Sequence, residues 1–549
     1  MTLRDSIAQI IKGDAVDDGE TRLKYSRDTS IFERTPQVVV FPKDADDVSA
    51  VVTFTHEEKS AGREVSVTGR SAGSDMTGGD LTDSISMVFM KYMNHIIEIT
   101  RDFAVAEPGV FYRDLEKETL EKTGKIIASY PASRNLCAIG GMVANNSGGE
   151  LTLRYGKTNR YVEELEVVLS DGTKTTVRAL SPEELAVKEK EDSFEGNIYR
   201  DVHALITEHA EEIKTARPNV TKNSAGYPLW DVVDEKTGTF DLNQLIAGSQ
   251  GTLALVTKAK IRLVKTKGHR SMLVVFLTDL GILPDIVHRV LKFGPESFES
   301  YDDQTMKLAV RFIPQIIGHF GIVQMIQLGF AFIPEMWMAL TGGVPKLIVM
   351  AEFAEDTAEE ALEKAKAAAA SLDGLAVKTK IARSETQAAK YWTIRRESFS
   401  LLRKNLRGLH AASFIDDLVV HPDDYPRFIP ELNTIMQEHH LIYTIAGHIG
   451  DANFHIIPLM NLADPAARRE IMVLTPKVYK LVAKYKGSIT GEHNDGIIRT
   501  PFLPIMYSEK MIELFAQIKK IFDPLGVLNP GKKVGGTIAD IERSMIKGK

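Results

Sequence analysis

Hydrophobic residues in the first half of the chain occur in short runs separated by turn residues. Residues 36–57 predict a short strand, a turn and an amphipathic helix. Residues 161–177 resemble a hairpin that turns at Asp171–Gly172, and the alternation over 252–264 predicts a half-buried strand. Further short strands are predicted at 64–69, 84–90, 94–99 and 103–110. The first half is therefore expected to be an α+β unit.

The pattern changes after about residue 265. Apolar runs at 271–279 and 345–353 predict sheet strands. Longer segments with helical spacing follow at 357–372, 427–441 and 471–487. We predict an α+β first domain over 1–265 and a second domain over 266–500, in which helices cover a sheet.

Composition limits the function. A chain of 549 residues is too long for one hydrophobic core, and a net charge of −7 argues against binding nucleic acid. The single cysteine, Cys137, excludes an internal disulfide and a four-thiolate iron–sulfur cluster. If the protein moves electrons, an organic cofactor or a partner must carry them. The N-terminus lacks the features of a secretory signal, so we expect a cytoplasmic protein.

Residues 312–334 form an uncharged stretch. As a helix these 23 residues would reach about 34 Å, nominally enough to span a bilayer. Polar residues interrupt the stretch, among them Pro314, Gln315 and His319, and polar groups are costly in hydrocarbon. We expect a buried helix pair, and the alternative is a patch that rests on the inner face of a membrane.

Three segments combine glycine with serine, threonine or asparagine: 69–80, 130–160 and 245–257. Such loops offer backbone N–H groups with little steric bulk, which suits a pyrophosphate. None is a P-loop, and none has the G-x-G-x-x-G pattern at the start of a helix. The alternative is three ordinary loops, which is less expected because each lies beside a predicted strand.

The order of these segments resembles the vanillyl-alcohol-oxidase-type flavoproteins, whose FAD-binding domain is of the PCMH type. The branch that oxidises D-lactate, glycolate and D-2-hydroxyglutarate is the most similar. The motifs that carry the resemblance are "RSAGSD" (70–75), "EPGV" (107–110), "IGGMVANNSGG" (139–149), "RYG" (154–156) and "GSQGTLALVT" (248–257). The resemblance implies a two-part FAD-binding domain, a substrate domain with an antiparallel sheet covered by helices, and a segment 501–549 that returns to the FAD domain.

The resemblance also implies the residues that bind FAD. These are Arg70, Ser71, Gly73, Ser74, Asp75, Gly78, Pro131, Ser133, Gly140, Gly141, Asn145, Ser147, Gly148, Tyr155, Gly156, Gly251, Val256 and Asn529. Two positions depart from the usual pattern, since Ala72 interrupts a triple-glycine turn and Gln250 replaces a glutamate. The 69–80 loop has no histidine, so we predict non-covalent FAD.

The stretch "GHIGDANFH" (447–455) predicts a strand, a Gly-Asp turn and a second strand. His448 and His455 can converge across that turn, and Glu492 of "GEHNDG" could complete a set of two nitrogens and one oxygen. Such a set suits Zn²⁺ first, and Mn²⁺ or Fe²⁺ as alternatives. The other interpretation is that these are packed or surface histidines.

The resemblance assigns roles to these residues. His448, His455 and Glu492 would hold the metal, His493 would be the base, and Asn453 would contact substrate. Ala452, Asn494 and Asp495 depart from the related motifs.

Two further segments concern the substrate. In "YWTIRRES" (391–398), Arg395 or Arg396 would grip a carboxylate, although a charged helix surface is an equal alternative. Ile415 occupies the position at which dicarboxylate-using relatives tend to carry a lysine, which favours D-lactate or glycolate.

We therefore predict an FAD-dependent dehydrogenase that oxidises a D-2-hydroxy acid to the 2-oxo acid. Electrons would pass to a quinone or a partner protein, and the protein could be a homodimer. Two alternatives remain: a flavin transferase like alkylglycerone-phosphate synthase, and a non-catalytic subunit with the flavin fold. "GEHNDG" has a single histidine, which argues against the transferase, and the retained Glu492–His493 pair argues against a non-catalytic subunit.

Overall fold

The strands predicted near the N-terminus form a four-stranded sheet in a computed structural model that describes residues 2–303, 345–382, 387–396, 409–439, 441 and 443–547. The strand order is β1-β2-β4-β3, with β1 at Asp14–Val16, β2 at Val38–Phe41, β3 at Val67–Arg70 and β4 at Ile85–Val88. Helix α3 (Ala45–Ser60) begins where Asp44 accepts the N–H groups of Asp46 and Asp47. Its buried Val48 and Val51 join the same core as the strands.

A second, five-stranded sheet has the order β5-β6-β9-β7-β8. The bounds are β5 Ile96–Ile99, β6 Phe103–Ala106, β7 Val162–Val168, β8 Lys174–Arg178 and β9 Leu255–Arg262. The predicted hairpin is β7–β8, and the predicted strand over 252–264 is β9. Helices α4 (Tyr112–Thr123), α5 (Ile139–Asn145), α8 (Phe194–Glu208) and α21 (Glu509–Phe522) contribute to the core beside this sheet.

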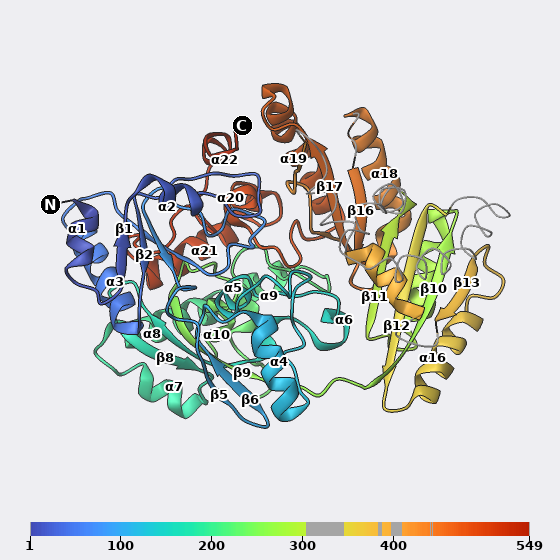
Figure 1. The fold of residues 1–549 in the computed structure, drawn as a ribbon, viewed down its shortest axis with the longest axis horizontal. Helices are drawn as coiled ribbons and strands as arrows, with labels where there is room; N and C mark the ends of the chain where they lie inside the picture. The colour runs from blue at the N-terminus through green and yellow to red at the C-terminus, as the bar shows by residue number, and fades with distance from the viewer. Residues whose placement is uncertain are drawn as a thin grey trace.

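The second half of the chain builds an antiparallel sheet. Its order is β13-β10-β12-β11-β16-β17-β14, and β15 pairs with β17. The bounds are β10 His269–Leu277, β11 Ser297–Asp302, β12 Leu347–Glu355, β13 Lys378–Ala382, β14 His410–Ala411, β15 Leu418–Val419, β16 Tyr443–His448 and β17 Asn453–Met460. Helices α11 (Leu283–Leu291), α16 (Ala358–Ala370), α18 (Tyr425–Glu438) and α19 (Pro465–Lys484) cover it (Figure 1). The predicted fold class is thereby confirmed.

The C-terminal segment lies beside the N-terminal domain, where its red ribbon meets the blue and green elements (Figure 1). Leu514, Phe515 and Ile518 of α21 are buried in the core of that domain. The backbone N–H of Glu33 also donates to the carbonyl of Ser544 at 2.8 Å. These contacts agree with a returning segment, and the exact domain limits stay a prediction.

The apolar stretch 312–334 lies outside the described residues, so its predicted burial or membrane contact is not tested. Among the helices that the structure does describe, none combines the length and the apolar character needed to cross a membrane.

Candidate active site

A cavity of about 630 Å³ lies between the N-terminal domain and the antiparallel sheet. All three glycine-rich segments line it, together with Glu299, Trp392 and Arg395 of the second domain. Fourteen of the predicted FAD-binding residues line the cavity: Arg70, Ser71, Gly73, Ser74, Asp75, Pro131, Ser133, Gly140, Gly141, Asn145, Ser147, Gly148, Gly251 and Val256. The structure thus brings segments that are far apart in the sequence to one site.

The carboxylate of Asp75 fixes the conformation of the loop that follows β3. Asp75 Oδ2 accepts the N–H groups of Thr77 at 2.9 Å and Gly79 at 2.7 Å, while Oδ1 accepts Asn145 Nδ2 at 3.0 Å. A Cβ at Gly140 would lie 2.5 Å from Pro108 Cβ and 2.7 Å from Ser71 Oγ. Only glycine fits at this close approach, which lets the start of α5 reach the cavity wall.

Four predicted FAD-binding residues do not line the cavity: Gly78, Tyr155, Gly156 and Asn529. The Tyr155 hydroxyl donates to Glu296 at 3.0 Å, and Gly156 ends helix α6 (Thr152–Tyr155) with a φ of 80°. Asn529 is fully buried, and its Nδ2 donates to the carbonyls of Gly79 at 2.8 Å and Gln250 at 2.6 Å. These four residues therefore lie outside the cavity lining, and their part in FAD binding stays a prediction.

The two histidines of the predicted metal set converge as expected. His448 ends β16, His455 lies in β17, and the two strands pair across the turn 449–452. Glu492 Oε1 lies 3.1 Å from His448 Nε2 and 3.6 Å from His455 Nε2. One ligand atom from each of the three residues lies within 4.8 Å of the others.

Two buried carboxylates orient these imidazoles. His448 Nδ1 lies 2.5 Å from Glu299 Oε1, and His455 Nδ1 lies 3.0 Å from Asp416 Oδ1. These contacts favour the Nδ1–H tautomer, so both Nε2 lone pairs face the carboxylate of Glu492. Three electron-pair donors that converge in this way can hold a cation between them. The donor set fits a divalent metal.

The charges around the set agree with this fit. Burial lowers the pKa of His448, but Glu299 and Glu492 raise it to about 9, so these carboxylates favour a positive charge here, which a proton on the ring or a bound cation supplies. Lys222 is fully buried, with Nζ 2.9 Å from Glu492 Oε2 and 3.3 Å from Asp451 Oδ2. Lys222 therefore holds one oxygen of Glu492 while the other faces the histidines.

His493 lies beside His455 and lines the cavity. Its Nδ1 is 3.1 Å from Asp416 Oδ2, and its backbone N–H donates to Asp417 Oδ2 at 2.7 Å. Burial lowers the pKa of His493, whereas Asp417 and Asp416 raise it to about 9. The two carboxylates therefore stabilise the protonated imidazolium of His493 relative to the neutral ring.

The two candidate arginines lie in the helical segment 387–396 and differ in their surroundings. Arg395 is nine-tenths buried, and its Nε and NH2 each lie 3.2 Å from Glu299 Oε2. Arg396 is half exposed, pairs with Glu150 at 2.6 Å and stacks on Trp392. Both line the cavity, but only Arg395 shares a partner with the metal set.

Two of the residues that the sequence relates to the substrate lie outside the cavity lining. Asn453 is fully buried and is not among the cavity-lining residues, because its Nδ2 donates to Asp417 Oδ1 at 2.9 Å behind the site. Ile415 is fully buried in the core of the second domain. Ile415 does not line the cavity, so no contact described here supports the preference for D-lactate or glycolate, which stays a prediction.

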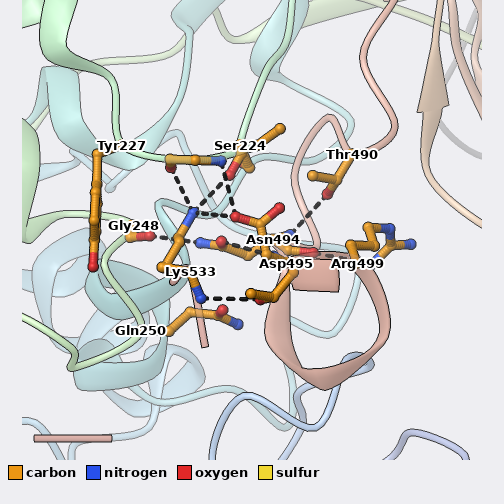
Figure 2. A network of polar contacts seen from close by, with 12 residues as sticks. Ser224, Tyr227, Gly248, Gln250, Thr490, Asn494, Asp495, Arg499 and Lys533 are labelled. Atoms are coloured by element: carbon orange, nitrogen blue, oxygen red, sulfur yellow. Dashed lines mark hydrogen bonds and ion pairs between the residues drawn. The ribbon is translucent and has the colours of Figure 1, made fainter. Parts of the chain in front are cut away.

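Three of the residues that depart from the related motifs, Gln250, Asn494 and Asp495, belong to a network of polar contacts (Figure 2). Asn494 has a φ of 76°, and its Nδ2 donates to the carbonyl of Gly248 at 2.8 Å. Asp495 pairs with the buried Lys533 at 3.0 Å, and Gln250 Oε1 accepts the N–H of Gly496 at 2.8 Å. Asn494 thus contacts the loop that carries Gln250, and Gln250 contacts the loop that carries Asn494. Ala452 adopts a φ of 55°, a conformation that glycine would adopt more easily.

Four residues around the site have no role predicted from the sequence: Glu299, Asp416, Asp417 and Lys222. Of these, Asp416 and Asp417 directly follow Ile415, and two adjacent acidic residues in an apolar run were the available signal. Glu299 and Lys222 carry no local signal, since each reaches the site from a distant loop or strand.

Two protein families match the chain. Residues 36–178 match the family described as FAD binding domain, and residues 266–533 match FAD linked oxidases, C-terminal domain.

Curated relatives are similar over nearly the whole chain. D-2-hydroxyglutarate dehydrogenase of Pseudomonas putida is 27% identical over 95% of this chain and 50% of the relative. Glycolate oxidase subunit GlcD of Bacillus subtilis is 24% identical over 96% of both chains. D-lactate dehydrogenase of Archaeoglobus fulgidus is 26% identical over 90% of this chain and 91% of the relative. The chain spans about half the length of the first of these relatives.

Solved structures share the fold. 4-Ethylphenol oxidase from Gulosibacter chungangensis has a TM-score of 0.66 at 15% identity, covering 98% of this chain and 97% of the other. Alkyldihydroxyacetonephosphate synthase has a TM-score of 0.64 at 14% identity, covering 94% and 83%. p-Cresol methylhydroxylase has a TM-score of 0.67 at 14% identity, covering 98% and 96%. At such identities the likeness concerns the fold alone.

Proposed function

We propose that this chain, which matches the FAD binding domain over 36–178 and the FAD linked oxidases, C-terminal domain, over 266–533 and shares the fold of p-cresol methylhydroxylase, oxidises a D-2-hydroxy acid to the 2-oxo acid. One observation carries the proposal. His448, His455, Glu492 and His493 converge with Arg395 on the cavity that the FAD-binding loops also line. D-Lactate, glycolate and D-2-hydroxyglutarate are all candidate substrates, because relatives with each of these names are similar to the chain.

Each side chain has a defined task in this proposal. Arg395 binds the substrate carboxylate through its guanidinium fork. His493 accepts the proton of the 2-hydroxyl, and the carboxylates of Asp416 and Asp417 stabilise the resulting imidazolium. A divalent metal held by His448, His455 and Glu492 would polarise the hydroxyl and lower its pKa. FAD, held without a covalent bond by the three glycine-rich segments, would accept the hydride.

The remaining parts of the proposal concern location and partners. Electrons would leave to a quinone or to a partner protein. The protein could form a homodimer and contact a membrane through 312–334. The domain division at 265 and 500 belongs to the same proposal.

The test of the base uses His493→Ala and His493→Gln. Both variants are expected to retain FAD, seen in the visible spectrum, and to lose at least about 100-fold in the rate of flavin reduction by the hydroxy acid. The control is His95→Ala, because His95 is exposed and pairs with Glu107. Unchanged reduction rates in both His493 variants would overturn the assignment of the base.

A further inference from the structure

The carboxylate of Glu299 contacts both His448, a proposed metal ligand, and Arg395, the arginine proposed to bind substrate. Its Oε1 lies 2.5 Å from His448 Nδ1, and its Oε2 lies 3.2 Å from Nε and NH2 of Arg395. The side chain is almost fully buried and reaches the cavity wall. The two oxygens of Glu299 are therefore divided between a metal ligand and the arginine that is proposed to bind the carboxylate.

The sheet explains this placement. Strand β11 lies between β12 and β16, and Ser300 pairs with Gly447 in the antiparallel register. The next position along both strands sets Glu299 opposite His448. Arg395 approaches from the helical segment 387–396, on the same side as the cavity. Because β11 is an interior strand with neighbours on both sides, the backbone of Glu299 is held rigidly.

Glu299 is not itself placed as a ligand of the proposed metal. Its contact with His448 is at Nδ1, on the opposite edge of the imidazole from Nε2, which faces Glu492. A carboxylate in this position fixes the ring orientation and tautomer of a ligating histidine. A carboxylate that accepts the Nε side of a guanidinium likewise fixes the plane of the arginine fork.

Resting on the proposed function, we propose that Glu299 is a positioning residue that links metal binding to the arginine. It holds His448 and Arg395 in a fixed relation to each other, so that the metal set and the arginine can act on the hydroxyl and the carboxylate of one substrate molecule. A change at Arg395 is then transmitted to the metal set through Glu299, although Arg395 is not among the three ligands.

The experiment measures the affinity for Mn²⁺ by equilibrium dialysis of the FAD-loaded protein and its variants. Glu299→Gln is nearly isosteric, and it is expected to weaken Mn²⁺ binding by about 10- to 100-fold. Retained FAD absorbance and an unchanged far-ultraviolet circular dichroism spectrum show that this variant is folded. Glu299→Asp keeps the charge but is one methylene shorter, so it is expected to lose contact with one partner and to weaken binding as well.

A double-mutant cycle tests the link itself. Arg395→Met is expected to change the Mn²⁺ affinity in the wild-type background, and this change should differ by at least about threefold in the Glu299→Gln background. Arg396→Met is the matched control, because the neighbouring Arg396 pairs with Glu150 rather than Glu299. It is expected to give the same change in both backgrounds.

The outcomes separate the two levels of the proposal. If the wild type binds Mn²⁺ and the effect of Arg395→Met is equal in both backgrounds, the link through Glu299 is overturned and the proposed function stands. If Glu299→Gln binds Mn²⁺ as tightly as the wild type, the positioning role is overturned. If the wild type binds no divalent metal at all, the proposed metal set fails, and the inference fails with it.

Discussion

The imidazole rings of His455 and His493 stack with their centroids 5.1 Å apart. Asp416 contacts both rings, at 3.0 Å from His455 Nδ1 and 3.1 Å from His493 Nδ1. The carboxylate is fully buried, and the two histidines lower its pKa despite the opposing effect of burial. One aspartate thus supports both the proposed metal set and the proposed base.

Asp416→Asn is expected to weaken both functions. An asparagine can present an amide to His455 and favour the wrong tautomer, so Mn²⁺ affinity should fall by about 10- to 100-fold. His493 also loses a carboxylate that stabilises its protonated form, so the rate of flavin reduction should fall at least about tenfold. Equilibrium dialysis and anaerobic stopped-flow absorbance measure the two effects. Asp423→Asn, at an exposed aspartate, is the control and should change neither.

Ile415→Lys is expected to destabilise the protein rather than to alter its substrate. Ile415 is buried among apolar side chains of the second domain, and a lysine there would bury an unpaired ammonium. Such a burial costs several kcal/mol. Thermal denaturation measures this loss. A variant of wild-type stability that gains activity on D-2-hydroxyglutarate would show that position 415 faces the substrate.

Asn529→Ala is expected to loosen the FAD-binding loops from behind. The variant leaves the buried carbonyls of Gly79 and Gln250 without the amide that joins them, and each unpaired group costs about 1–3 kcal/mol. Because both loops line the cavity, FAD affinity should fall together with stability. Recovery of FAD fluorescence on release gives the affinity. The control is Asn94→Ala, at an exposed site, which should bind FAD with the affinity of the wild type.

The buried carboxyl of Glu352 is expected to make the stability of the protein depend on pH, and replacing it by glutamine should remove this dependence. Burial raises the pKa of this carboxyl from 4.5 to about 7, although Trp392 Nε1–H donates to it and Arg270 lies nearby. Below pH 4.5 both the folded and the unfolded states are protonated. Between pH 4.5 and 7 only the unfolded state ionises, so stability falls as the pH rises through this window.

Glu352→Gln should therefore be more stable than the wild type above pH 7, by roughly 3 kcal/mol, and equal to it near pH 4. Chemical denaturation at several pH values measures the difference. A difference that does not change with pH would show that Glu352 keeps its ordinary pKa in the folded protein.

Elements whose residues carry the pattern within one short segment could be predicted from the sequence. The turn between β16 and β17 could be predicted because "GHIGDANFH" carries its own strand and turn residues, and His448 and His455 follow from that geometry. The FAD-binding loops could be predicted because glycine is required where backbone approaches closely, as at Gly140. The resemblance to known flavoproteins added the roles.

The partners of these residues could not be predicted in the same way. Glu299 is 149 positions from His448, and only the register of β11 against β16 brings the two together. Ile415 and Asp416 are adjacent, yet one lies in the core and the other contacts two histidines. Both residues lie in the loop between β14 and β15, and the path of that loop, which composition alone does not determine, decides which of the two faces the site.

The most direct test of the central claim is the visible spectrum of the protein under anaerobic conditions. D-Lactate, glycolate and D-2-hydroxyglutarate are added in turn, before and after treatment with a chelator. The account predicts a flavin spectrum that bleaches with at least one acid, and a bleaching that is lost on chelation and restored by Mn²⁺ or Zn²⁺. A bound flavin that none of the three acids reduces would contradict the proposed oxidation of a D-2-hydroxy acid.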